Sequence, residues 1–189
     1  MDTRSVGHVA RWKSMVPSHD PELRATAYHE AGHAVAAFVL RRPIRTASIE
    51  PAEGSLGRVE HHPPGKWFQP DAGVDTRTRN LVKRHIVGHL AGPLAEERFT
   101  GSHNETGATS DHHHAVDLAS YLVDDDERLQ ILVDDLSSRA AELLARTDVW
   151  RAVEAVAEEL VRDRLLAGRE VRAVIRRTGL RPGGRVFAR

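Results

Sequence analysis

The sequence predicts a mainly α-helical domain with one small β-hairpin or sheet. Apolar residues recur at intervals of three and four along most of the chain, as is typical of amphipathic helices. Only two short segments, residues 44–49 and 56–61, are rich in strand-forming residues and bounded by turn formers. With 189 residues, of which 40% are hydrophobic, the chain is large enough for one packed domain.

The expected domain spans residues 21–178. Residues 1–20 have mixed charge and no periodicity, so we expect a flexible N-terminal tail. Residues 179–189 include a Pro-Gly-Gly segment and are expected to form a flexible C-terminal tail.

The first helix has a clear start and a clear stop. Asp20–Glu22 supplies an N-cap, a proline at the first helical position and an acid in the first turn. The helix should reach Leu40 and end before Pro43, because the residue before a proline avoids helical geometry. Ile44–Ile49 and Leu56–His61 should follow as two strands around a turn.

The middle of the chain predicts a loop and then a long helix. His62–Val74 is rich in Pro and Gly, and helical periodicity begins at Asp75. Gly88 and Gly92 lie four apart, which leaves a smooth face on which another helix can pack closely. Pro93 should kink or restart this helix.

The last part of the chain is expected to be helical. Thr100–Thr109 consists largely of turn formers and predicts a loop, after which Ser110 or Asp111 should cap a helix that runs through Val123. Further helices are expected at residues 127–146, 148–167 and 169–177.

Composition excludes several classes of function. The 27 basic and 27 acidic residues cancel, so nothing favours nucleic acid or an anionic membrane as a partner. The absence of cysteine leaves His, Asp and Glu as possible metal ligands. The longest apolar run, Ala34–Leu40, is far shorter than the roughly 20 residues that span a bilayer. We therefore expect a cytoplasmic protein with no membrane segment.

His29-Glu30-Ala31-Gly32-His33 is an HExxH motif. Residues four apart lie on one face of a helix, so both histidines can bind one Zn²⁺ at about 2.0–2.1 Å. Glu30 would lie beside the metal and take a proton from a bound water. The alternative is a chance motif with two solvated histidines, but the apolar segment that follows favours a buried pair that needs partners or a metal.

The motif supplies two ligands, and a catalytic zinc usually takes three from the protein. Residues 34–40 are apolar, so the third ligand must come from farther along the chain. A helix start after a glycine-containing loop fixes the direction of a side chain, and Asp111 fits this description. The full set of candidates is His61, His62, His85, His89, Glu96, Glu97, His103, Asp111, His112, His113 and His114.

Several candidates also have other interpretations. His112–His114 are expected to be solvated or to support a ligand, with an auxiliary metal site as the alternative. His85 and His89 should pack between helices. Ligand histidines usually donate their other ring nitrogen to a carboxylate or carbonyl, and Glu96 or Glu97 could accept that bond unless both are solvated.

Two further segments could contact a substrate. Leu56–Glu60 is either an exposed edge strand, to which an extended peptide can add, or an ordinary hairpin strand. Trp67 and Phe68 either form a lid or are buried against the domain.

Four blocks of this sequence resemble the peptidase domain of FtsH-type ATP-dependent zinc metalloproteases, and the similarity extends over roughly residues 22–178. The blocks are Tyr28–Ala34 (YHEAGHA), Ala47–Gly57 (ASIEPAEGSLG), Leu90–Glu97 (LAGPLAEE) and Thr106–Ala119 (TGATSDHHHAVDLA). The resemblance implies a helical zinc peptidase with His29, His33 and Asp111 as metal ligands and Glu30 as the catalytic base.

The sequence also departs from the family pattern. That family normally carries a membrane segment and an ATPase module before the peptidase, and neither is visible here, since no GxxxxGK[ST] phosphate loop occurs. Pro93 replaces an arginine, and Ser110 replaces the asparagine before the ligand aspartate. Neither change removes a ligand.

The expected function is that of a stand-alone zinc endopeptidase that hydrolyses unfolded or flexible polypeptides. A separate ATPase is a possible partner, and an oligomer is possible. The alternatives are a non-catalytic zinc-binding module for regulation or interaction, and a peptidase whose zinc is blocked by its own tail until triggered.

Overall fold

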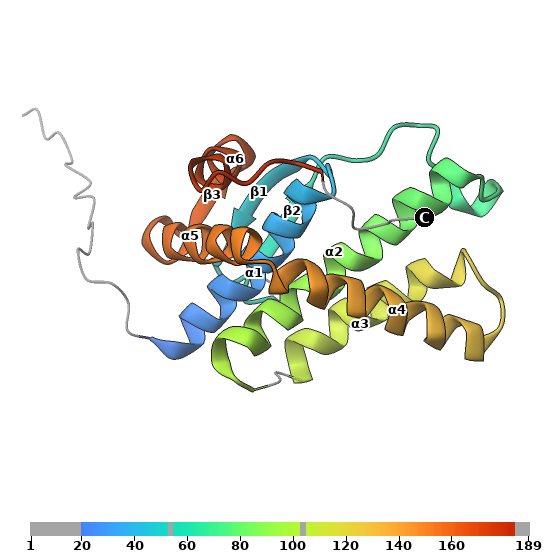
Figure 1. The fold of residues 1–189 in the computed structure, drawn as a ribbon, viewed down its shortest axis with the longest axis horizontal. Coiled ribbons are helices and arrows are strands. Elements are labelled where there is room, and N and C mark those ends of the chain that lie inside the picture. Colours follow the sequence, from blue (N-terminus) through green and yellow to red (C-terminus); the bar gives the residue numbers. More distant parts are fainter. Residues whose placement is uncertain (1–19, 53–54, 103–104, 184–189) are drawn as a thin grey trace, which may run out of the picture.

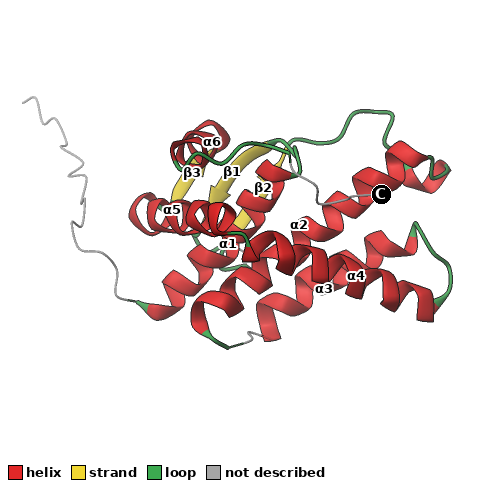
Figure 2. Ribbon diagram, viewed as in Figure 1, coloured by secondary structure: helices red, strands yellow, loops and turns green. Residues whose placement is uncertain are grey.

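The computed structural model describes residues 20–52, 55–102 and 105–183. In this part of the chain, helices dominate and one small antiparallel sheet lies against them (Figures 1 and 2), so the predicted fold class is confirmed. The helices are α1 (Pro21–Val39), α2 (Thr76–Thr100), α3 (Glu105–Ser120), α4 (Asp126–Ala145), α5 (Thr147–Asp163) and α6 (Gly168–Arg177). The strands are β1 (Ile44–Ser48), β2 (Arg58–His61) and β3 (Leu165–Ala167), and a short 3-10 helix, η1, spans Pro70–Ala72.

Helix α1 is the central element of the domain, and its predicted boundaries are confirmed. The Asp20 carboxylate accepts hydrogen bonds from the backbone N–H groups of Glu22 and Leu23, at 3.0 and 3.3 Å. The helix packs between α2 and α5, and its C-terminal half is buried on all sides. Full burial of a side chain such as Val35 contributes roughly 1.5–3 kcal/mol to folding, so this packing fixes the position of the HExxH segment firmly.

Helix α2 runs without interruption through Pro93, so the restart expected there is wrong. The proline lacks the N–H that would bond the carbonyl of His89, which costs roughly 3 kcal/mol in a helix interior. Contacts of α2 with α1, α3 and α4 offset this cost. The helix ends at Gly101, whose φ of 74° suits a glycine at a left-handed cap.

Helix α3 begins earlier than the sequence indicates. Its first residue is Glu105, so Asp111 lies in the second turn and does not cap the helix as predicted. One glycine, Gly107, costs only about 1 kcal/mol in a helix, which is too little to prevent helix formation when later turns pack on α2. The direction of Asp111 is therefore fixed by helix packing.

The sheet has three strands in the order β2-β1-β3, and the third was not predicted. Residues 148–167 were expected to be one helix, but α5 ends at Asp163 and Arg164 takes a positive φ of 65°. The chain then pairs antiparallel with β1, with Leu166 opposite Ala47. Its apolar residues continue the pattern of α5, so periodicity alone could not separate strand from helix.

The chain stays packed on the domain after α6. Leu180 is buried, and the N–H of Gly183 donates to the carbonyl of Val39 at 2.9 Å. The packed part thus extends beyond the predicted boundary at residue 178. Residues 1–19 and 184–189 of the two predicted tails lie outside the described residues. In the part that is described, no helix is both long enough and apolar enough to cross a membrane.

Candidate metal centre

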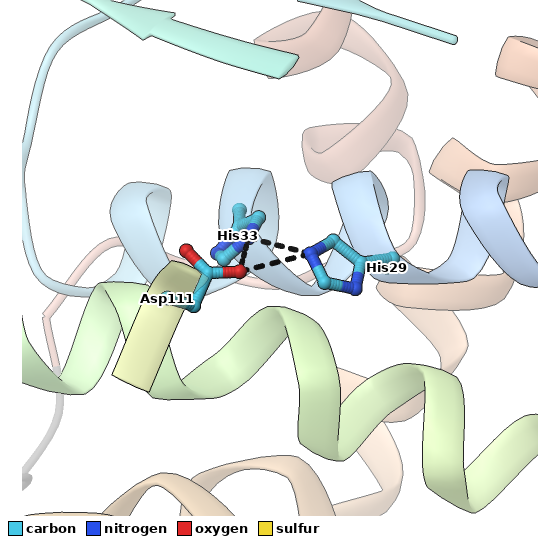
Figure 3. Close-up of side chains that lie close together, drawn as sticks. All are labelled: His29, His33 and Asp111. Atoms are coloured by element: carbon cyan, nitrogen blue, oxygen red, sulfur yellow. Dashed lines mark hydrogen bonds and ion pairs between the residues drawn. The ribbon is translucent and has the colours of Figure 1, made fainter. Parts of the chain in front are cut away.

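Three side chains from two helices converge on one point. His29 and His33 project from one face of α1, and Asp111 reaches them from α3, as Figure 3 shows. The Nε2 atoms of the two histidines lie 3.1 Å apart, and the Oδ2 atom of Asp111 lies 3.0 Å from the first and 3.1 Å from the second. Tetrahedral ligands at 2.0–2.1 Å from zinc lie about 3.3 Å from one another. The three donor atoms fit a zinc ion.

The other ring nitrogen of each histidine has a partner on α2. The Nδ1 atom of His29 donates to Oε2 of Glu96 at 2.8 Å, and that of His33 donates to the carbonyl of Gly88, also at 2.8 Å. Such bonds fix the ring orientation and leave each Nε2 lone pair for a metal. Of the two acids considered from the sequence, Glu96 makes this contact, and it is buried.

Small residues on α2 permit this close approach. A Cβ atom at Gly92 would lie 2.3 Å from Nε2 of His33, so any larger residue would displace that ring. On the other side of the contact, a Cβ at Gly32 would lie 2.5 Å from the carbonyl oxygen of Ala91. The smooth glycine face expected from the sequence is therefore the face that receives the HExxH helix.

Glu30 lies beside this centre and is only 5% exposed. Among the described residues, its Oε2 is the one buried side-chain oxygen or nitrogen that has no hydrogen-bond partner. Burial raises the pKa of Glu30, and the neighbouring His33 and His29 oppose that rise. An unpaired carboxylate oxygen inside a protein costs about 1–3 kcal/mol or more, so it suggests a function such as holding a water.

A cleft of about 480 Å³ opens onto these residues. The segment before β2 forms one wall, where Gly57 lies so close that a Cβ would come within 2.7 Å of Oε1 of Glu30. Arg42, His61 and His89 also line the cleft. Arg42 was not among the sequence candidates, and Gly57 appeared there only as part of the hairpin segment, because their positions in the cleft depend on contacts between distant segments.

His89 was expected to pack between helices, and it does more than this. Its Nδ1 atom lies 3.3 Å from Oδ1 of Asp111, so it belongs to the surroundings of this candidate metal centre. Its position one turn after His85 favoured helix packing, although His89 was also among the candidate ligands. All three histidines of the run, His112–His114, are exposed, and His114 also lines the cleft. His103 lies outside the described residues.

Trp67 and Phe68 stack on side chains of α2. The Phe68 ring stacks on His85 with centroids 5.8 Å apart, and the guanidinium of Arg77 lies 3.6 Å above the Trp67 ring. Burial, with a smaller contribution from the charge of Arg42, lowers the pKa of His85 to about 3. These contacts favour packing for His85 and Phe68, whereas Trp67 stays 41% exposed and is not buried against the domain.

Without a metal, the side chains of this centre shift one another's pKa values. Burial lowers the pKa of His29, but hydrogen bonds to Asp111 and Glu96 outweigh it and raise the pKa to about 10. Burial likewise raises the pKa of Asp111, but the charge of His33 and the bond from His29 hold it well below its usual range. Metal-free His29 is therefore protonated at neutral pH.

We expect zinc binding to release about one proton at pH 7, because the ion must displace the one on His29. Protons compete with zinc at every pH below the His29 pKa, so the apparent zinc affinity should rise with pH, by up to about tenfold per unit between pH 6 and 8. Calorimetric zinc titrations in buffers with different ionisation enthalpies measure the released protons. Equal zinc affinity at pH 6 and pH 8 would contradict this coupling.

Comparisons with known proteins identify the family of the chain. A sequence model of peptidase family M41 matches residues 17–125, which is more than half of the chain. ATP-dependent zinc metalloprotease FTSH 11 (chloroplastic/mitochondrial) of Arabidopsis thaliana is 37% identical over 114 residues, which are 59% of this chain and 13% of that protein.

Two further relatives come from other kingdoms. ATP-dependent zinc metalloprotease YME1L1 of Homo sapiens is 36% identical over 101 residues, which are 52% of this chain and 12% of that protein. ATP-dependent zinc metalloprotease FtsH of Caulobacter vibrioides is 34% identical over 108 residues, which are 56% of this chain and 16% of that protein. The match thus covers a small part of each relative. The chain belongs to peptidase family M41 and contains an FtsH-type peptidase domain.

Proposed function

We propose that the chain is a zinc-dependent endopeptidase, with zinc held by His29, His33 and Asp111 and with Glu30 as the catalytic base. The observation that carries this proposal is the position of the three donor atoms, within 3.1 Å of one another and beside a buried, unpaired Glu30 oxygen. When bound, zinc would polarise the scissile carbonyl and lower the pKa of a bound water.

Other side chains transfer the proton and hold the metal ligands in place. Glu30 takes the proton of the attacking water and later delivers it to the leaving amine. Its raised pKa favours the first transfer, because burial makes the carboxylate more basic than a solvated one and it therefore binds the proton of the water more firmly. Glu96 and the carbonyl of Gly88 hold the two imidazoles in place.

The substrate that fits the cleft is an unfolded or flexible polypeptide. Strand β2 is an edge of the sheet, and the residues leading into it line the cleft. An extended peptide can add to such an edge through backbone hydrogen bonds, which carry little sequence preference. This supports β2 as a docking edge rather than an ordinary hairpin strand.

The matched relatives are named ATP-dependent, and we propose an ATPase as the partner that unfolds folded substrates for this domain. An oligomer, the absence of a nucleic-acid partner and a cytoplasmic location stay predictions from the sequence. The alternative function is a non-catalytic zinc-binding module, in which the unpaired Glu30 oxygen would have no task.

The test is cleavage of casein, or of an unstructured quenched peptide, by zinc-loaded protein. We expect cleavage that a chelator abolishes and added Zn²⁺ restores. A protein that binds one zinc per chain and cleaves no unfolded substrate would overturn the proposal in favour of the non-catalytic module.

A further inference from the structure

The Asp111 carboxylate has two oxygens, and they lie near different histidines. Oδ2 lies between His29 and His33, as described above. Oδ1 lies 3.3 Å from Nδ1 of His89 on α2. His114 lies three residues after Asp111 on α3, so both project from the same side of that helix. Its ring faces that of His89 with centroids 5.3 Å apart.

His89, Asp111 and His114 bring three possible ligand atoms close together. One ligand atom each from His89, Asp111 and His114 lie within 4.8 Å of one another. The 3.3 Å between His89 and Asp111 already equals the spacing of two tetrahedral ligands, which is about 3.3 Å for bonds of 2.0–2.1 Å. His114 is exposed, so rotation about its side-chain torsions can bring its nitrogen to the same spacing.

The surroundings also suit a second ion. The ring centroids of His33 and His89 lie 6.4 Å apart, and each ring contacts one oxygen of the Asp111 carboxylate. The Asp111 side chain is 14% exposed and that of His89 is 30% exposed, which leaves one open side where water can complete a coordination shell. Two imidazoles and one carboxylate with open positions suit Zn²⁺ and its neighbours in the first transition row.

We propose that His89, His114 and Oδ1 of Asp111 form a second binding site for a divalent transition-metal ion, with Asp111 as a bridging ligand. The proposal rests on the proposed function, because it takes the first ion to be bound by His29, His33 and Oδ2 of Asp111. Paired ions in hydrolytic sites lie about 3.5–4 Å apart. The simpler alternative is a hydrogen bond from His89 to Asp111 with His114 solvated.

Zinc stoichiometry distinguishes these alternatives. Untagged protein is dialysed to equilibrium against increasing concentrations of free Zn²⁺. The number of zinc ions bound per chain is then measured by elemental mass spectrometry. For the wild type we expect one tightly bound ion and then a second, weaker one. His89→Ala and His114→Ala should each keep the first ion and lose the second. Retention of the first ion also shows that these variants fold.

His112→Ala and His113→Ala are the matched controls, since both residues are exposed on the same turn of α3. Both should still bind two ions. A wild type that binds only one ion, or variants at His89 and His114 that still bind two, would overturn the second site and leave the proposed function standing. A wild type that binds no zinc would overturn both.

Discussion

Glu30→Gln is expected to abolish most peptide hydrolysis while the protein keeps its zinc. The amide has the shape of the carboxylate but cannot take a proton from water, and positioned bases typically contribute about 100- to 10,000-fold to a rate. The donor atoms of His29, His33 and Asp111 are unchanged. We therefore expect kcat/KM for an unfolded peptide to fall by at least about 100-fold at wild-type zinc content.

Glu22→Gln is the matched control, because Glu22 is exposed in the first turn of the same helix. It should retain wild-type kcat/KM. Thermal melting separates catalysis from folding, and Glu30→Gln should melt no lower than the wild type, because it removes a buried carboxylate with an unpaired oxygen. Activity within tenfold of the wild type would show that Glu30 is not the base.

Asp111→Ala is expected to remove the zinc. It leaves two histidines as protein ligands, and catalytic zinc sites usually require three. Alanine is the best helix former, so helix α3 should persist in the variant. After dialysis at a free Zn²⁺ concentration that saturates the first wild-type site, the variant should hold almost none, and peptide hydrolysis should disappear with the metal.

His113→Ala provides the comparison, since His113 is exposed two residues farther along the same helix. It should keep full zinc and full activity. Helical content by circular dichroism should match in all three proteins. Full stoichiometric zinc in Asp111→Ala would show that the third ligand is another residue and would remove the basis for a bridging carboxylate.

Local sequence signals predicted much of the fold. The start of α1 follows from a cap, a proline and an acid that act within four residues, and its end follows from Pro43. The HExxH pair is also local, since spacing of four on a helix brings both rings to one face. Features that depend on contacts between distant residues were harder to predict from the sequence. Strand β3 exists only because β1 offers a partner more than 100 residues earlier, and its own pattern is that of a helix.

The sequence by itself determined a helical domain, the helix that carries His29, Glu30 and His33, and the chemistry those residue types allow. Only the tertiary structure decided that Glu96 rather than Glu97 supports His29, and that His89 approaches Asp111. Both contacts join different helices, and the first spans 67 residues of sequence. Such contacts depend on how closely helices pack, and here glycines such as Gly92 set that distance for the whole site.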